Sequence, residues 1–337
     1  MKVLFLGLGG IGQRHLRILK EILPNSIISA VRHSSNAIEI TDTLELNPEI
    51  NIEEKYNIKT FPSIEKAVID KPDFAIIANP TSMHVETARK LVEHKIPVLL
   101  EKPISNSDGM VDELAKLSIK NKTPVMIAYM MRFHPCVVKL EKYINDCILG
   151  NIYNISIDVN SYMPSWHKYE SYNSFYAGRN DLGGGVILTE IHEIDLLNFF
   201  FGIPEKLYAV GGKRSSLDLD VEDSANILME YKNGDSKFAV TLNMSFVQQT
   251  PLRQFNIFGE SGSILWNIAE NSIKLNDYIN SYEEDHSYDN FQRNDLFRDQ
   301  MLHFIESIKN KRVPLTDISR VLGSHKIAMS IKKALKI

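Results

Sequence analysis

The chain opens on a glycine-rich turn that separates two segments of different periodicity. Val3–Leu6 is a continuous apolar run, and Gly7–Gly12, which follows it, has the form Gly-x-Gly-x-x-Gly. Apolar residues then recur at helical spacing over Gln13–Leu23, and Ile27–Val31 is apolar again. This order predicts a β-α-β unit, in which the amides at the start of the helix are free to face a phosphate. The alternative is a turn that binds nothing, and the position of Gly7–Gly12 between a strand and a helix argues against this alternative.

Strand-like and helix-like segments keep alternating as far as residue 128. Phe74–Ala78 is a continuous apolar run, which is typical of a parallel strand covered on both faces. Further apolar runs at Val98–Leu100 and Val125–Ala128 alternate with helical patterns over His84–His94 and Gly109–Asn121. The sequence therefore predicts an α/β protein in which residues 1–128 form a doubly wound parallel sheet of the Rossmann type.

The pattern changes after residue 128. Ile152–Val159 largely alternates apolar and polar residues, and more strand-like segments, separated by turn residues, lie at 206–210, 224–231, 237–244 and 254–258. Helices are expected over 185–200, 295–309 and 317–335. We therefore expect a second domain, 129–337, of α+β type on a large, mostly antiparallel open sheet, with its last helices free to pack back on the first domain. Two domains also suit a length of 337 residues.

Composition excludes several classes of protein. Hydrophobic residues make up 44% of the chain and charged residues 24%, which is ordinary for a globular protein, and the net charge of −4 argues against partners such as nucleic acid or a membrane surface. No apolar stretch approaches the length of a membrane span, and the N-terminal run lacks the cleavage site of a signal peptide. Cys136 and Cys147 are isolated, which is typical of a reducing compartment, so we expect a cytoplasmic protein. No cluster has the spacing of metal ligands, so no metal is expected.

Three turns fall at the carboxyl ends of predicted parallel strands, where ligands of such sheets bind. They are Gly7–Gly12, Asn79-Pro80 and Glu101-Lys102-Pro103. Lys102 would hold its ammonium group over this crevice. The alternative is a solvated surface lysine, and the position of Lys102 alone does not decide between a functional and a surface lysine.

A second group of candidate residues follows the three glycines Gly183–Gly185. The expected helix places His192 and Asp195 three residues apart on one face. Such a histidine could exchange a proton near neutral pH, whereas a satisfied core histidine is the commoner outcome. Upstream, Trp166–Tyr172 offers aromatic rings and hydroxyls that suit a sugar or polyol, or that pack as a loop.

Several motifs together resemble the Gfo/Idh/MocA family, the relatives of glucose-fructose oxidoreductase and inositol dehydrogenase. In chain order they are Gly7-x-Gly9-x-x-Gly12-x-x-His15, Asn79-Pro80-x-x-x-His84, Glu101-Lys102-Pro103, Tyr129-x-x-Arg132-Phe133-x-Pro135, Gly183–Asp195 and Phe258-Gly259-x-x-Gly262. The resemblance implies a Rossmann domain and a C-terminal domain whose open sheet often mediates oligomers, so a homo-oligomer is expected. It also implies NAD(P)-dependent oxidation or reduction of a hydroxyl or keto carbon in a sugar, a sugar derivative or a cyclitol.

The resemblance assigns roles to individual residues. The family's catalytic lysine falls on Lys102, and its helix histidine falls on His192. Many relatives have an aspartate three or four residues before that histidine, where this chain has Thr189 and Leu188. The role of the aspartate is therefore empty, or Asp195 or Glu190 fills it. The expected cofactor-binding residues are Gly7, Gly9, Gly10, Ile11, Gly12, Arg32, His33, Ser34, Asn79, Pro80, His84, Glu101 and Lys102.

The end of the second strand bears on the choice of cofactor. NAD sites usually offer an acidic side chain about 20 residues beyond the glycines. Arg32 stands at about that distance, and no Asp or Glu follows before Glu39. Because an arginine can pair with a 2′-phosphate and Ser34 can add a hydrogen bond, the sequence predicts NADP in preference to NAD.

The expected substrate is a polyhydroxylated ring bound between the domains, such as a sugar nucleotide or an amino sugar. Trp166 and Tyr169 would stack on the ring, and its polar groups would be bound by Tyr129, Arg132, His167 and Asp195. Arg132 could instead pair with Asp195 or Glu190 as part of the scaffold, and the sequence leaves both options open.

Two other classes of function stay open. One is an NAD-dependent lyase or hydrolase that oxidises its substrate transiently. The other is a dinucleotide-binding regulator without catalysis, which would need neither Lys102 nor His192.

Overall fold

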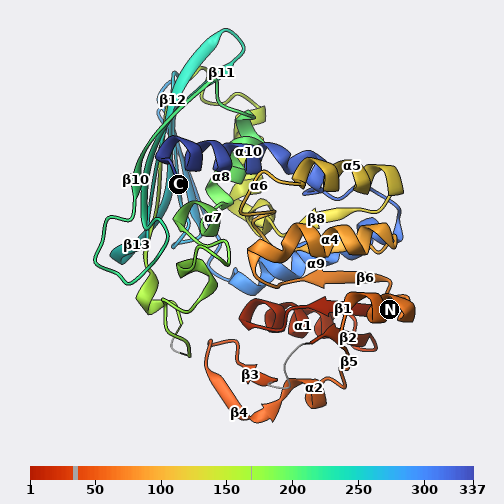
Figure 1. The fold of residues 1–337 in the computed structure, drawn as a ribbon. Coiled ribbons are helices and arrows are strands. Elements are labelled where there is room, and N and C mark those ends of the chain that lie inside the picture. Colours follow the sequence, from red (N-terminus) through yellow and green to blue (C-terminus); the bar gives the residue numbers. More distant parts are fainter. Residues whose placement is uncertain (33–36, 168) are drawn as a thin grey trace.

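The computed structural model describes residues 1–32, 37–167 and 169–337, and two large sheets organise them (Figure 1). The first sheet has six strands in the order β5-β2-β1-β6-β7-β8, all parallel. Their bounds are β1 Lys2–Leu6, β2 Ile27–Val31, β5 Lys59–Phe61, β6 Phe74–Ile77, β7 Val98–Leu100 and β8 Val125–Ile127. The predicted doubly wound parallel sheet is therefore confirmed.

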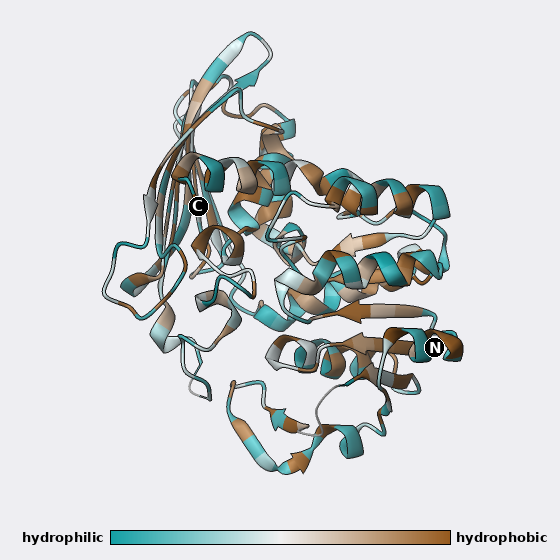
Figure 2. Cartoon of the chain, in the orientation of Figure 1, coloured by the Kyte–Doolittle hydropathy of each residue, from teal (hydrophilic) through white to brown (hydrophobic). Residues whose placement is uncertain are grey.

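Helices cross between these strands and cover the sheet. The main ones are α1 Gly10–Ile22, α4 His84–Glu93 and α5 Val111–Asn121, with the short α2 Ile52–Lys55 and α3 Ile64–Ala67. All four residues of β6 are buried, and Figure 2 shows strands such as β6 in the colour of hydrophobic residues between helices of mixed colour. This is the expected result of a continuous apolar run placed between two layers of helix. A separate pair, β3 Ile38–Ile40 and β4 Leu46–Asn51, follows β2.

The second sheet has eight strands in the order β10-β11-β12-β9-β13-β14-β15-β16. Their bounds are β9 Ile152–Tyr162, β10 Lys206–Gly212, β11 Ser224–Asn233, β12 Ser236–Ser245, β13 Val247–Gly259, β14 Gly262–Asn267, β15 Ser272–Asp277 and β16 Tyr282–Ser287. Only β12 and β9 pair in parallel, so the predicted, mostly antiparallel sheet is confirmed.

Register places one row of apolar side chains on the inner face of this sheet. Paired neighbours across six strands are Met229, Val240, Ile155, Ile257, Ile264 and Leu275, and each of them is buried. The inner face carries the helices α6 Pro135–Asn145, α7 Val186–Thr189 and α8 His192–Phe201, while the opposite face is uncovered (Figure 1). Alternating apolar and polar residues in the strands explain this two-sided sheet.

The last two helices, α9 Arg293–Lys309 and α10 Ile318–Leu335, return to the first sheet. α9 packs on α1, and Arg298 bonds Glu21 there at 2.6 Å. Between the helices, the backbone of Thr316 accepts a hydrogen bond of 2.9 Å from the amide of Ile127 in β8. The C-terminal segment thus covers an edge of the N-terminal sheet.

Candidate active site

The glycine turn joins β1 to α1 and packs closely on neighbouring backbone. Gly7 has a φ of +105°, and a Cβ placed on it would lie 2.4 Å from the carbonyl oxygen of Ala78. A Cβ on Gly12 would lie 2.3 Å from the oxygen of Gly7, so neither position admits a side chain. A Cβ on Gly9, by contrast, would meet nothing within 4 Å. The start of α1 therefore faces open space on this side, as binding of a dinucleotide pyrophosphate requires.

The turn after β6 lies beside the glycine turn and offers an unused acceptor. The ring of His84 contacts the carbonyl oxygens of Pro103, at 2.7 Å, and Asn79, at 2.9 Å, and so joins two strand-end turns. Asn79 donates its amide to Thr87 at 3.1 Å, whereas its Oδ1 is buried and has no partner within the described ranges. An orphaned acceptor here suits a donor on a bound ligand. The residues around the glycine turn thus fit a dinucleotide.

Lys102 is held from both sides at the end of β7. Glu101 accepts a hydrogen bond of 3.2 Å from the amide of Lys102, and its other oxygen lies 2.7 Å from Nε2 of His15. The ammonium of Lys102 donates to the carbonyl oxygen of Thr189 at 2.6 Å. Burial lowers the pKa of Lys102, while the carboxylates of Glu190 and Glu101 act in the opposite direction.

The helix expected over 185–200 is wrong as a single element. α7 ends at Thr189, Glu190 has φ −98° and ψ 36°, and α8 begins at His192. His192 therefore starts a helix instead of lying inside one. It is 4% exposed, and its Nδ1 has no hydrogen-bond partner within the described ranges. Burial first, and the charge of Lys102 second, lower the pKa of His192 well below its ordinary value, so the free ring is neutral.

Tyr129 lies next to His192 in the interior. The two rings meet edge to face, with their centres 6.3 Å apart. The Tyr129 ring is fully buried, and its hydroxyl has no partner among the residues described. A ligand could bond this hydroxyl only by entering the interior as far as the ring. Burial raises the pKa of this hydroxyl, which keeps it protonated.

Arg132 takes the scaffold option that the sequence left open. Its guanidinium bonds both oxygens of Asp195, at 2.8 and 2.7 Å, and the two side chains are 3% and 1% exposed. Ser324 of α10 donates to the same carboxylate at 2.7 Å, and the ring of Phe199 lies 4.4 Å from the guanidinium carbon. The pair is enclosed, and Arg132 and Asp195 bond each other as the scaffold option predicts; that either residue binds the substrate's polar groups stays a prediction. Because Arg132 and Ser324 bond the Asp195 carboxylate, Asp195 does not take the role of the absent aspartate in this structure.

Sequence reasoning missed a second arginine–carboxylate group. Arg253 of β13 bonds both oxygens of Glu193, at 2.7 and 2.9 Å, and lies 3.5 Å from the carboxylate of Glu190. Burial acts to lower the pKa of Arg253, but the two glutamates outweigh it and raise that pKa. The only signal was a charged residue directly before the strand-like segment 254–258, and nothing in the sequence indicates its partner 60 residues upstream.

The aromatic loop packs against itself and against Phe246, and it reaches the glycine turn. Trp166 meets the ring of Phe246 edge to face at 5.2 Å. His167 stacks on Tyr169 at 5.0 Å. A Cβ placed on Gly10 would lie 2.9 Å from the Tyr169 hydroxyl, so Tyr169 stands beside the cofactor-binding residues predicted from the glycine turn.

The residues predicted to choose between NAD and NADP are described only in part. Arg32 follows β2, and its Nε lies 2.9 Å from the carboxylate of Glu53 at the start of α2. His33 and Ser34 lie outside the described residues.

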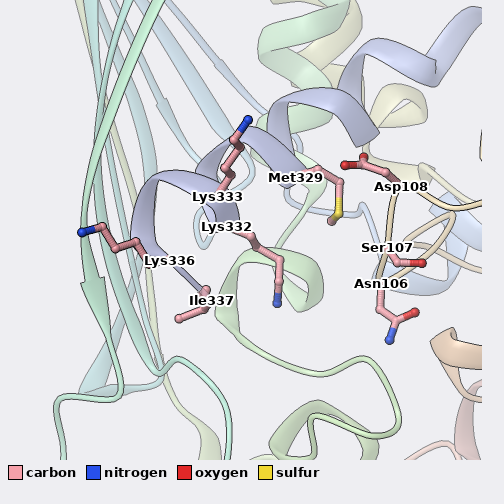
Figure 3. Close-up of a pocket in the computed structure, with 8 residues that line it drawn as sticks. All are labelled: Asn106, Ser107, Asp108, Met329, Lys332, Lys333, Lys336 and Ile337. Atoms are coloured by element: carbon pink, nitrogen blue, oxygen red, sulfur yellow. The ribbon is translucent and has the colours of Figure 1, made fainter.

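A cavity of about 500 Å³ lies elsewhere, between the loop 106–108 and the end of α10. In Figure 3 its three lysines, Lys332, Lys333 and Lys336, point in different directions. They do not converge on one ligand. Over the described ranges, no group of three or more His, Cys, Asp or Glu could hold a metal ion, and no helix there has the length and apolar character to cross a membrane.

Fold and site together define an oxidoreductase built on a dinucleotide-binding domain. Residues 1–129 match the oxidoreductase family with an NAD-binding Rossmann fold, and residues 137–265 match the Gfo/Idh/MocA C-terminal domain. The chain belongs to the Gfo/Idh/MocA family of oxidoreductases, as its motifs predicted.

Similar proteins differ in their named reactions. The chain is 26% identical over 238 residues to 2,7-anhydro-N-acetylneuraminate hydratase of Mediterraneibacter gnavus, a match that spans 69% of this chain and 59% of that protein. UDP-N-acetylglucosamine 3-dehydrogenase GnnA from Acidithiobacillus ferrooxidans aligns with a TM-score of 0.77 at 20% identity, over 100% of this chain and 98% of that one. The WlbA dehydrogenase from Bordetella pertussis, in complex with NADH and UDP-GlcNAcA, aligns with a TM-score of 0.79 at 17% identity, over 99% and 96%. At these identities the structures establish the fold alone.

Proposed function

We propose that the protein transfers a hydride between NAD(P) and a hydroxyl or keto carbon of a sugar-like substrate. The observation that carries this proposal is the contact between Lys102 and the carbonyl of Thr189, because it brings the ammonium to the helix break that presents His192. A regulator that only binds a dinucleotide would need neither group. Bound NAD(P) supplies the hydride acceptor or donor of such chemistry.

The three ionisable side chains at the break have distinct roles in this proposal. Lys102 stabilises negative charge that develops on the substrate oxygen. The neutral ring of His192 accepts the hydroxyl proton during oxidation and returns it during reduction. Glu190 takes the place of the absent aspartate, but acts on Lys102: its carboxylate is the strongest of the charges that raise the pKa of that ammonium.

The residues that would hold NAD(P) are those of the glycine turn, Asn79 and Arg32. The glycine turn would take the pyrophosphate, and the orphaned Oδ1 of Asn79 would accept from the ligand. We propose NADP as the preferred cofactor because Arg32 follows β2 at about the spacing of the usual acidic residue of NAD sites, and an arginine can pair with a 2′-phosphate. Glu53, 2.9 Å from Arg32, competes for that guanidinium, so the preference is expected to be modest.

For the substrate, we propose a nucleotide sugar, an amino sugar or another sugar derivative. Support comes from the named substrates of similar proteins and from the aromatic loop. The hydratase among the relatives supports a second candidate, in which transient oxidation at the same site precedes elimination or hydration. In that reaction the cofactor is regenerated in each turnover.

One assay separates the two candidates. The protein is incubated with candidate sugars and either NAD or NADP, and the absorbance of the reduced cofactor is followed while the products are identified. Stoichiometric reduction supports the dehydrogenase. Product formation with a catalytic amount of cofactor supports the lyase or hydratase. If neither outcome is seen with any class of substrate, the result argues against both candidates.

Assembly and location complete the proposal. We propose that copies associate through the uncovered face of the eight-stranded sheet, where Tyr208, Val210, Leu228 and Phe258 are exposed. These exposed apolar side chains offer a second copy a surface to pack against. We also propose a cytoplasmic location, consistent with two free cysteines, Cys136 and Cys147.

A further inference from the structure

Arg14 stands over the first turn of α1 and contacts an aromatic ring of α9. It comes four residues after Gly10 and therefore shares its helix face, and helical side chains lean toward the helix N-terminus. The carbon of its guanidinium lies 5.2 Å from the centre of the Phe297 ring in α9. Within the described ranges no carboxylate pairs with Arg14, whereas Arg17, one turn later, bonds Asp42 at 2.8 Å.

Arg293 approaches the same place from the other helix. It is the first residue of α9 and lies one turn before Phe297, so both side chains share the face that meets α1. Its charge reaches both Lys102 and His192, and it lowers the pKa of each of them. No carboxylate pairs with Arg293 among the residues described. Burial first, and the charge of Arg14 second, lower the pKa of Arg293, while Glu190 and Glu101 act in the opposite direction.

The acidic side chains of the cleft are already committed. Glu193 and Glu190 lie against Arg253, at 2.7 and 3.5 Å, and Glu101 lies 2.7 Å from His15. Two guanidinium groups are therefore left to repel each other across the α1–α9 contact. Such groups favour an anion between them, and the planar guanidinium suits a carboxylate or a phosphate.

We propose that Arg14 and Arg293 form an anion site that binds a carboxylate or phosphate group of the substrate. The anion lies between the glycine turn and Lys102, and this orients the reacting carbon toward Lys102 and His192. That the anion belongs to the substrate rests on the proposed function, whereas the existence of the anion site does not. A phosphate of the dinucleotide is the other source of the same chemistry, so the experiment must separate the two.

The test is calorimetric titration with inorganic pyrophosphate, first of the protein alone and then of the protein saturated with NADPH. We expect pyrophosphate to bind in both states. Arg14→Ala and Arg293→Ala should each weaken its binding at least about tenfold, the scale of a lost charge-assisted hydrogen bond. Arg17→Ala and Arg298→Ala are matched controls on the same two helices, since both side chains have acidic partners.

A second titration compares glucuronate with glucose on the protein saturated with NADPH. Arg14→Ala and Arg293→Ala should weaken glucuronate and leave glucose unchanged. Two results overturn the proposal. In the first, pyrophosphate binding is unchanged in both variants. In the second, saturation with NADPH abolishes pyrophosphate binding and the variants also bind NADPH more weakly. The latter assigns the arginines to the cofactor. No turnover is measured, so failure of the proposed reaction does not affect this outcome.

Discussion

The ammonium of Lys102 donates a 2.6 Å hydrogen bond to the main-chain carbonyl of Thr189. Thr189 is one of the two positions at which the family resemblance leads one to expect an aspartate, and here its backbone, not its side chain, reaches the lysine. The Thr189 hydroxyl is buried and has no partner within the described ranges. The lysine is thus oriented by a neutral group, and among the carboxylates Glu190 has the largest effect on its pKa, which it raises against the effect of burial.

Lys102→Met should abolish most turnover and leave folding intact. The side chain keeps its length but loses its charge, and removal of a positioned acid–base group costs about 100-fold or more in rate. The check is steady-state kinetics beside a thermal melt, with Lys90→Met, a surface lysine paired with Glu65, as the control. Activity within a few-fold of wild type would refute the role of Lys102.

The pH profile of oxidation should show an acid limb well below pH 6.5. Burial lowers the pKa of His192 from that ordinary value, and the ring is a base only when neutral, so activity persists to lower pH and falls as pH drops through the lowered pKa. His192→Asn should remove this limb. An acid limb at or above pH 6.5, or one unchanged in His192→Asn, would contradict the prediction.

Glu190→Gln should move the alkaline limb of kcat/KM to lower pH. The carboxylate of Glu190 raises the pKa of Lys102, so its removal lets the ammonium lose its proton earlier as pH rises. The measurement is a pH series of reduction rates, with the exposed Glu205→Gln as control. An unchanged alkaline limb would mean that Glu190 acts only on Arg253.

Acid should destabilise the protein through His134. Burial lowers the pKa of His134 from 6.5 to about 4, and Nδ1 of the ring accepts a hydrogen bond from the amide of Cys136 at the start of α6. The unfolded chain binds the proton first, so stability is lost as pH falls from about 6.5 toward 4. Between pH 7 and 5 the loss should be about 2 kcal/mol.

His134→Asn keeps an acceptor for the Cys136 amide but does not titrate. Denaturant unfolding of both proteins at pH 7 and pH 5 checks the prediction, because the variant should show a smaller drop. Equal drops would assign the acid sensitivity to other groups.

Arg32→Ala should weaken NADPH more than NADH. Loss of a bidentate phosphate contact corresponds to about tenfold in affinity. Fluorescence titration with both cofactors measures this, with Arg17→Ala as the control. Tighter binding of NADH by the wild-type protein would sink the proposed preference.

Periodicity was enough to predict the type of both sheets, because buried parallel strands and half-exposed antiparallel strands leave different patterns. It failed where the pattern does not change: apolar residues continue through the break at Glu190, so two helices looked like one. β14, β15 and β16 were not predicted, and in β16 no residue is buried to set an alternation. At the site, strand-end position singled out Lys102, but the pairing of Arg132 with Asp195 joins residues 63 apart and depends on tertiary packing.

The contact between Thr316 and β8 has a consequence for the order of folding on the ribosome. The N-terminal sheet is complete in sequence by residue 127, yet its β8 edge and the face of α1 that packs on α9 are covered by residues beyond 292. During synthesis this edge stays exposed until the whole second sheet has been translated. Slow translation after β8 would therefore favour aggregation of the nascent chain, and a chaperone that binds open sheet edges would be of most use at that stage.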